Sequence, residues 1–354
     1  MDEQKKEKPL RLLVILEKGF IHPSSFLRAW MFREQFDRAG YVTKFANHYF
    51  AGPLLWRVKP LFDLYTYLNE LRLVRLAKSA DVVYLAKVHS FRLISRLKKT
   101  GARLVLITGD AFWLPQYADP DLDRTLPLLD MLISDNEETL KYLRQFNPNC
   151  VLLPDCPQIE LFDAARAAIK KNTEGPVVLG WVGTQSTVYN LYLIWEVLER
   201  LFAKHKNLHL RLVGTGNEPR LLPPFEKVKY SVVETYTQAE MVREVLKMDI
   251  GLFPLQDTEG SRVRGVLKAS VYMSGEAAVI GSPVGQSADF IKEGVNGMLA
   301  NSDEEWERKL EQLISDKPLR QKLAKGGLET VRDNFTLERA FAILRSALEG
   351  KKYG

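Results

Sequence analysis

Cysteine is nearly absent from this chain. Its 354 residues include only two cysteines, Cys150 and Cys156, and no histidine accompanies them at the spacing of a metal site. A disulfide framework needs more cysteines, and a zinc site needs further ligands. We therefore expect two free thiols.

Long apolar runs are also absent. No stretch of about 18 uncharged apolar residues occurs, and the N-terminal sequence MDEQKKEKP lacks the apolar core of a signal peptide. Apolar residues make up 46% of the chain and charged residues 27%, as in folded soluble proteins. We expect a cytoplasmic protein and leave open peripheral binding to the inner face of a membrane.

A dinucleotide-binding fingerprint is missing too. No GxGxxG pattern follows a predicted strand, and the segment LVGTGNE lacks both the third glycine and the helix that should follow it. This absence argues against a dehydrogenase.

Basic residues are concentrated in one segment. Residues 57–103 hold 11 Lys and Arg but only 3 Asp and Glu, a net charge of +8. Such a segment favours an anionic partner, either a phosphorylated molecule or a membrane surface, although a solvated helical face explains the charge equally well. The wider segment 52–103 also mixes aromatic and apolar residues with the bases, which suits contact with an anionic membrane. No nucleic-acid-binding module accompanies the charge, so we expect no nucleic-acid partner.

Strand-like and helix-like segments alternate along the chain, which predicts an α/β fold with parallel sheets. The predicted strands are residues 10–16, 41–47, 81–87, 103–109, 131–135, 150–155, 177–183, 208–214, 228–233, 248–255 and 276–282. The helices predicted between and after them include residues 24–39, 61–78, 90–99, 137–145, 303–314, 317–333 and 336–349.

The strand–helix pattern restarts after a polar connector, and this predicts two domains. We expect an N-terminal Rossmann-like domain over residues 1–160, a linker over 161–176 and a second Rossmann-like domain over 177–335. The last helix, within 336–354, is expected to pack back on the first domain. Two such domains facing each other across a cleft would bind ligands at the carboxyl ends of their strands.

Several motifs make the chain resemble the GT-B glycosyltransferases, and among them the retaining glycosyltransferase family 4. They are GWVGT, DIGLFPLQDT, LKASVYMSG, AAVIGSPVG and EGVNGMLA in the second half, with EKGFIHPS and LLPDCPQIELF as looser matches in the first. The resemblance implies transfer of a sugar from a nucleotide diphosphate to an acceptor in glycan biosynthesis, with retention and without a metal or other cofactor. The acidic run DPDLD resembles the metal motif of another glycosyltransferase fold, but a polar loop is the favoured interpretation.

The chain departs from family 4 at two carboxylates. Where the family has two Glu residues separated by seven others, this sequence has Val263 and Val271. Arg264 and Lys268 lie nearby and would share one face of a helix that began near Ser261. Both can stabilise the negative charge that develops on a leaving diphosphate, so we predict that they are catalytic and bind the donor. A surface-exposed basic helix is the alternative.

Further donor-binding residues are expected in the loops that follow strands, where backbone amides or a stacking ring could contact the nucleotide. They are Gly19, Gly183, Thr184, Tyr236, Gly285 and Ser287. The glycines could equally serve plain turns.

On the acceptor side, Asp110 directly follows a first-domain strand. It could orient or deprotonate an acceptor hydroxyl, or it could simply cap a helix. His22 and His89 also follow strands and could contact the acceptor, although such histidines are more often structural.

These observations favour a glycosyltransferase that uses a nucleotide sugar and a glycan or lipid-linked acceptor. The alternative is a catalytically degenerate GT-B protein that binds a nucleotide, glycan or protein partner without transfer, since both motif carboxylates are replaced.

Overall fold

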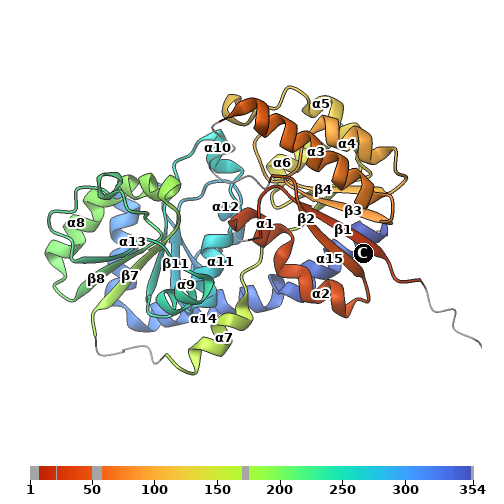
Figure 1. Cartoon of the computed structure of the whole chain (residues 1–354). Helices are drawn as coiled ribbons and strands as arrows, with labels where there is room; N and C mark the ends of the chain where they lie inside the picture. Colours follow the sequence, from red (N-terminus) through yellow and green to blue (C-terminus); the bar gives the residue numbers. More distant parts are fainter. Residues whose placement is uncertain (1–7, 21, 50–57, 170–174, 352–354) are drawn as a thin grey trace, which may run out of the picture. The chain divides into compact units, whose positions relative to one another are not determined.

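The computed structural model describes residues 8–20, 22–49, 58–169 and 175–351. The chain forms two compact units, the first from residues 1–155 and 338–354 and the second from residues 156–337. Each unit contains one six-stranded parallel sheet with helices on its faces (Figure 1). Both units are therefore Rossmann-like, as the alternating sequence pattern predicts.

The sheet of the first unit has the strand order β2-β1-β3-β4-β5-β6, and every pair is parallel. Its strands are β1 (Arg11–Leu16), β2 (Val42–Asn47), β3 (Val82–Ala86), β4 (Arg103–Ile107), β5 (Met131–Ser134) and β6 (Cys150–Leu152). Its helices are α1 (Pro23–Arg28), α2 (Arg33–Arg38), α3 (Lys59–Ala77), α4 (Phe91–Lys98), α5 (Leu122–Thr125), α6 (Glu137–Leu143) and α15 (Leu337–Glu349).

Helices α3, α4, α5 and α6 contribute to one apolar core together with the sheet of this unit. The C-terminal helix α15 also belongs to the first unit. Its Phe341 ring lies 5.6 Å from the Phe36 ring of α2, and the Tyr41 hydroxyl donates to a Glu349 carboxylate oxygen at 2.7 Å. The end of the chain therefore completes the unit in which the chain begins.

The helix predicted over residues 24–39 is interrupted. Helix α1 ends at Arg28, and Ala29 has φ −150° before a short 3₁₀ turn leads into α2. The Trp30 ring lies 4.6 Å from the Phe20 ring and 4.8 Å from the Phe45 ring. These ring contacts accompany a bend that the hydrophobic pattern alone did not reveal.

The sheet of the second unit has the strand order β12-β11-β10-β7-β8-β9, again entirely parallel. Its strands are β7 (Val177–Val182), β8 (Leu208–Val213), β9 (Tyr230–Val233), β10 (Ile250–Phe253), β11 (Ala278–Gly281) and β12 (Gly297–Leu299). Its helices are α7 (Ile159–Arg166), α8 (Trp195–Lys204), α9 (Gln238–Val245), α10 (Glu259–Arg262), α11 (Leu267–Ser274), α12 (Ser287–Phe290), α13 (Asp303–Ser315) and α14 (Lys317–Asn334).

Two cores cover the two faces of this second sheet. Trp181 of β7 belongs to the core shared with α8 and α13, and its neighbour Val182 belongs to the core shared with α7, α9, α11 and α14. This alternation follows from the two-residue period of a strand. Both faces are buried, as is usual for a parallel sheet.

The strand orders identify where a ligand is expected in each unit. In the second unit β7 lies between β10 and β8, so chain connections leave it in opposite directions, and β1 has the same position between β2 and β3 in the first unit. Ligands of open α/β sheets bind beyond the carboxyl ends of the strands at such switch points. In the second unit these are the segments that follow β7 and β10.

All eleven predicted strands are present, with ends that agree within three residues. Strand β12 and helices α5 and α12 were not predicted, because each has only three or four residues, too few for a clear hydrophobic period. Helix α7 was not predicted either, since most of it lies in the segment expected to be a linker. The helix expected to run from about Ser261 is divided: α10 ends at Arg262 and α11 begins at Leu267. Arg264 and Lys268 therefore do not share one continuous helix. Gly265 lies in the break, and glycine disfavours a helix by roughly 1 kcal/mol relative to alanine.

Candidate functional site

The loop after β7 is built from contacts within the fold. The Gly183 amide donates to the Val213 carbonyl at 2.9 Å, and the Thr184 amide donates to the Thr187 hydroxyl at 3.2 Å. Thr184 also caps a 3₁₀ helix, η5 (Gln185–Leu193). Neither amide is available to a phosphate, so the sequence-based idea that these two amides contact the donor does not fit this geometry.

Gly183 has a steric role instead. A Cβ atom at this position would lie 2.3 Å from the Trp181 ring, and one at Gly214 would lie 2.1 Å from the Gly183 carbonyl oxygen. The Tyr236 hydroxyl donates to that same carbonyl at 3.2 Å. The segments that follow β7, β8 and β9 are thus packed together at the carboxyl edge of the sheet.

Lys268, near the start of α11, reaches this loop. Its Nζ donates to the Thr187 hydroxyl at 3.2 Å and lies 4.6 Å from the centre of the Trp181 ring. Burial and the nearby charge of Arg264 lower the pKa of Lys268 to about 7. The second cause shows that the two basic groups are close enough to repel each other.

Arg264 lies in the break between α10 and α11. Within residues 8–20, 22–49, 58–169 and 175–351 its side chain forms no hydrogen bond or ion pair, and its Nε is buried without a partner. Arg262, two residues earlier, instead forms an exposed ion pair with Asp257 at 2.7 Å. The described part of the chain therefore leaves Arg264 and Lys268 as neighbouring cations without a carboxylate. Such an arrangement is unfavourable until an anion binds.

The loop after β11 positions α10 from the other side. Gly285 has φ +57°, and a Cβ atom there would lie 2.4 Å from the Arg262 carbonyl oxygen, so only glycine fits. Ser287 is 1% exposed, and its hydroxyl bonds with backbone groups of Ser282 and Val284. That hydroxyl is therefore occupied within the loop, and it offers nothing to a donor in this structure.

The two positions at which the resemblance to family 4 leads us to expect carboxylates are apolar and buried. Val263 is 8% exposed and Val271 is 7% exposed, and Val271 packs in the core shared with α9 and α14. Neither side chain can form a hydrogen bond with a sugar or a ribose.

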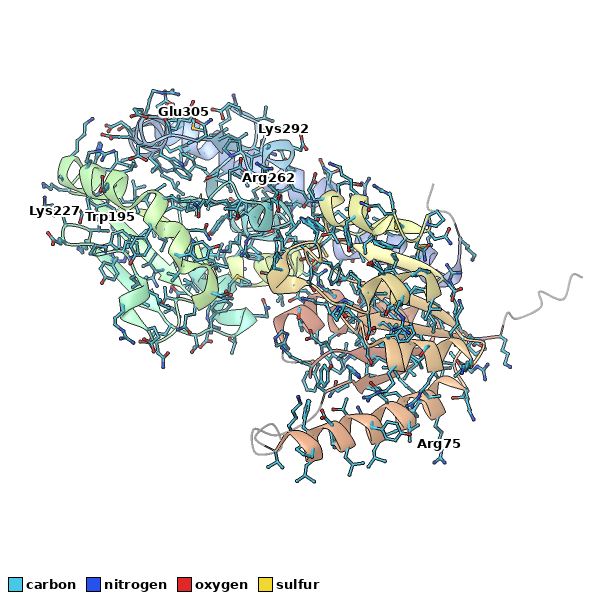
Figure 2. All side chains as sticks on the ribbon, turned by 90° about the horizontal axis from the view of Figure 1, so that it is seen from above. Arg75, Trp195, Lys227, Arg262, Lys292 and Glu305 are labelled. Carbon is cyan, nitrogen blue, oxygen red and sulfur yellow. The ribbon has the colours of Figure 1, made fainter. Side chains whose placement is uncertain are left out.

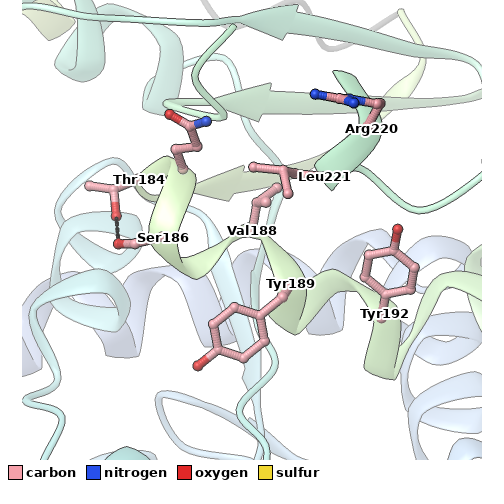
Figure 3. A pocket seen from close by; sticks show the side chains of 8 residues that line it. Thr184, Ser186, Val188, Tyr189, Tyr192, Arg220 and Leu221 are labelled. Carbon is pink, nitrogen blue, oxygen red and sulfur yellow. Dashed lines mark hydrogen bonds between the residues drawn. The ribbon is translucent and has the colours of Figure 1, made fainter. Parts of the chain in front are cut away.

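An open groove of about 700 Å³ runs along η5 from the loop after β7 (Figure 3). Its lining residues are Thr184, Gln185, Ser186, Val188, Tyr189, Tyr192, Arg220 and Leu221. The tyrosines are nearly half exposed. Sequence reasoning missed this groove, although the spacing of Tyr189 and Tyr192 would place both on one face of a 3₁₀ helix.

In the first unit, Asp110 is paired with a lysine that the sequence analysis did not select. Lys87 follows β3, and its Nζ lies 2.8 Å from an Asp110 carboxylate oxygen. The Thr108 hydroxyl lies 3.5 Å from the other Asp110 oxygen and 3.2 Å from His89 Nε2. Burial lowers the pKa of His89 to about 4, so its imidazole is neutral at neutral pH. Lys87 has φ +59°, an uncommon conformation for a residue other than glycine.

A second ion pair lies close to the first. Arg28 contacts an Asp135 carboxylate oxygen at 3.0 Å, and a Cβ atom at Gly109 would collide with both side chains. Burial raises the pKa of Asp155, Arg28 opposes the rise, and the Asp135 carboxylate adds to it. Sequence reasoning missed these groups, although Asp135 and Asp155 each end a predicted strand segment as Asp110 follows one.

His22 and Gly19 lie in the segment after β1. His22 Nδ1 lies 2.8 Å from the Ser24 hydroxyl, and burial and then Lys18 lower its pKa. Gly19 accepts a hydrogen bond from the His22 amide, and a Cβ atom there would meet no neighbour within 4 Å. The conformation of this loop therefore does not require glycine at position 19.

Two kinds of feature, a metal-binding cluster and a membrane-spanning helix, are absent from the described residues. Among the residues described, no group of three or more His, Cys, Asp or Glu side chains is arranged to hold a metal ion. In the same part of the chain, no helix combines the length and apolar character required to cross a bilayer.

The second unit matches a known family by sequence. Residues 176–316 match the model of the family described as glycosyl transferases group 1. The chain matches no curated protein sequence.

Solved structures match nearly the whole chain at low sequence identity. The HepE protein of Anabaena in complex with UDP is 13% identical and has a TM-score of 0.66, over 96% of this chain and 100% of that one. A glycosyltransferase from Rickettsia africae is 14% identical with a TM-score of 0.70, over 96% and 97% of the two chains. An alpha-glucosyltransferase in complex with UDP and DNA is 12% identical with a TM-score of 0.67, over 97% and 100%. These likenesses confirm the predicted GT-B fold.

Proposed function

We propose that this protein is a glycosyltransferase that moves a sugar from a nucleotide diphosphate to an acceptor. One observation carries the proposal: Arg264 and Lys268 lie close together at the switch point of the second sheet without a carboxylate partner in the described part of the chain. A diphosphate would supply the missing negative charge. The match of this unit to glycosyl transferases group 1 and the UDP present in structures of the same fold support it.

The two cations can act on the transition state as well as on binding. As the bond between the sugar and the diphosphate breaks, negative charge accumulates on the leaving oxygen. A fixed cation beside that oxygen lowers the barrier, typically by about 2–4 kcal/mol for one contact. Arg264 offers several N–H donors in one plane, and Lys268 adds a compact charge held against Trp181. With two such cations, the proposed reaction needs no metal ion.

The proposed stereochemical outcome is retention, in keeping with the resemblance to family 4. Neither motif carboxylate is present here, so the sugar and ribose hydroxyls must be recognised by other groups. The Thr184–Ser186 end of the groove along η5 offers three polar side chains next to the cations. We propose that this end of the groove contacts the donor.

A degenerate protein that binds a nucleotide without transferring a sugar is the second candidate. The apolar burial of Val263 and Val271 favours it, because these positions supply no polar contact to the donor.

The acceptor is proposed to be a glycan, presented on a lipid at an anionic membrane. Four leucines on one face of α3 are 42–55% exposed: Leu61, Leu64, Leu68 and Leu71. We call this surface the leucine stripe. Arg75 and Lys78 continue the same face, and Figure 2 labels Arg75 on α3. Exposed leucines beside bases suit the boundary between lipid chains and anionic headgroups. Part of the segment predicted for this role, residues 52–57, lies outside the described residues.

A binding screen followed by a transfer assay tests the proposal. Thermal unfolding of the full chain would be measured with UDP-, GDP-, dTDP- and CMP-sugars, and at least one should raise the unfolding temperature. No response to any of them would contradict the proposal. Binding without hydrolysis or transfer across a panel of glycan acceptors would favour the second candidate.

A further inference from the structure

Lys87 and Arg28 of the first unit differ from Arg264 and Lys268 of the second in one respect, which is that each has a carboxylate partner among the described residues. Lys87 is paired with Asp110, and Arg28 is paired with Asp135. Asp155 adds a third carboxyl group to the cluster. An anionic ligand would therefore meet at least two carboxylates here, and it would have to displace them to reach either cation.

The four paired groups form one electrostatic cluster. Asp110 and Asp155 both act on the charge of Arg28, and Lys87 acts on the charge of Asp155. Arg28 and Asp135 are nearly buried, with 11% and 7% of their side chains exposed. Lys87 and Asp110 are more accessible, at 22% and 24%. A ligand in solution can thus reach the Lys87–Asp110 pair more readily than the Arg28–Asp135 pair.

The accessible pair offers complementary hydrogen-bonding groups. The Lys87 ammonium is a donor only, and the ionised Asp110 carboxylate is an acceptor only. A hydroxyl group can accept from the first and donate to the second at the same time. A carboxylate has no proton to donate at neutral pH and a phosphate monoester is mostly dianionic, so Asp110 would repel either group. Neutral His89 and the Thr108 hydroxyl add further uncharged partners.

We propose that the Lys87–Asp110 pair, supported by Arg28 and Asp135, binds uncharged, hydroxyl-rich groups such as the sugar of a glycan acceptor. Any anionic part of the acceptor is recognised elsewhere. This inference rests on the proposed function only in identifying the sugar as part of an acceptor. The binding of a neutral polyol to the first unit does not depend on that function. Asp110 orients the sugar hydroxyl by accepting a hydrogen bond from it.

Ligand-detected NMR on the full chain tests the inference. The probes are glucose, galactose and mannose, each compared with its 6-phosphate in separate samples saturated with UDP. At least one neutral sugar should bind, and its phosphate should bind no more tightly. Asp110→Asn and Lys87→Met should each weaken that binding about ten-fold or more, because each removes one charged hydrogen-bond partner.

The control variant is Lys98→Met, which removes the lysine of another ion pair in the same unit, with Asp130 at 2.7 Å. It should leave sugar binding unchanged. Arg264→Ala should weaken UDP binding and leave sugar binding unchanged. A failure of the nucleotide site can therefore be distinguished from a failure of the sugar site in the first unit. The inference is overturned if no neutral sugar binds, if a sugar phosphate binds more tightly, or if the Asp110 and Lys87 variants match the control.

Discussion

The ammonium group of Lys268 lies 4.6 Å from the centre of the Trp181 ring and 3.2 Å from the Thr187 hydroxyl. These contacts join the first turn of α11 to β7 and to η5, on two sides of the switch point in the second sheet. A ring face and a hydroxyl hold the ammonium in place without cancelling its charge. The lysine therefore remains available to an anion, with Arg264 beside it.

Replacing either cation should weaken nucleotide binding without weakening the fold. We expect Arg264→Met and Lys268→Met each to raise the Kd of the responding nucleotide sugar by about 10- to 100-fold, from loss of a charged contact. The pKa of Lys268 is lower in the folded chain than the ordinary value of 10.5, so protonation at pH 7 favours the unfolded state. The Lys268→Met variant should accordingly unfold at no lower a temperature than the parent.

Arg262→Met is the control, because Arg262 forms an exposed ion pair with Asp257. Calorimetric titration and thermal unfolding measure the two effects. Equal losses of affinity in the Arg262 variant and the other two would argue against the assigned roles.

Nucleotide binding should depend on pH between 7 and 8.5. With a pKa of about 7 in the free protein, Lys268 is mostly neutral at pH 8.5, and a bound diphosphate would raise its pKa. Affinity is then full well below pH 7 and falls as the pH rises through 7, by about ten-fold between pH 7 and 8.5. Titration at pH 8 in buffers of different ionisation enthalpy should detect uptake of close to one proton.

In Lys268→Met the same titrations should show neither the proton uptake nor the fall in affinity. A pH dependence that persists in this variant would assign the effect to another group.

Gly183→Ala should damage the nucleotide site and the stability of the second unit. The added methyl group would lie 2.3 Å from the Trp181 ring and 2.8 Å from the Thr187 hydroxyl oxygen, the two contacts of Lys268. Overpacking of this kind typically costs about 1–3 kcal/mol. Chemical denaturation and nucleotide titration would measure both effects. Gly19→Ala is the matched control, because its methyl group would meet nothing within 4 Å. Equal stability of the two variants would contradict the packing argument.

Glu70→Gln should make the first unit less stable at neutral pH. Glu70 is 1% exposed and bonds with Ser90, His48 and Arg92, and its pKa falls to about 2 although burial opposes this. A carboxyl group with a lowered pKa stabilises the fold above its unfolded pKa, near 4.5, and loses that contribution as the pH falls toward 2. Because Arg92 is half exposed, we expect a loss of about 1–3 kcal/mol in the free energy of unfolding.

The stability difference between parent and Glu70→Gln should shrink between pH 4.5 and 2. Asp63→Asn, an exposed position on the same helix, should change little. A pH-independent difference between parent and Glu70→Gln would show that the charge of Glu70 is not its cause.

Replacing leucines of the stripe should reduce binding to anionic vesicles and leave the fold intact. The double variant Leu64→Ser, Leu68→Ser removes two side chains that are 53% and 55% exposed, so little buried area is lost. We expect sedimentation with phosphatidylcholine vesicles containing 30% phosphatidylglycerol to fall at least five-fold. Pure phosphatidylcholine should bind the parent weakly. Equal sedimentation of parent and variant would rule out the stripe as the contact.

Much of the fold could be predicted because its signals are local. Apolar strand segments such as 10–16 and 103–109 are separated by helical patterns, and each strand formed where its own residues are suited to burial. The bend at Ala29 and the break at Gly265 could not be predicted. The bend is accompanied by the ring contacts of Trp30, and the break lies beside the close approach of Arg262 to Gly285. Both sets of contacts join segments that are far apart in the sequence.

The sequence by itself determined the two Rossmann-like halves and the basic residues that follow β10. Only the tertiary structure decided which charges are compensated. Arg28 meets Asp135 across 107 positions and Lys87 meets Asp110 across 23, whereas Arg264 meets no acid in the described part of the chain. The reason is physical: an ion pair depends on distances of a few ångströms, and parallel strands bring together loop residues that the sequence keeps apart.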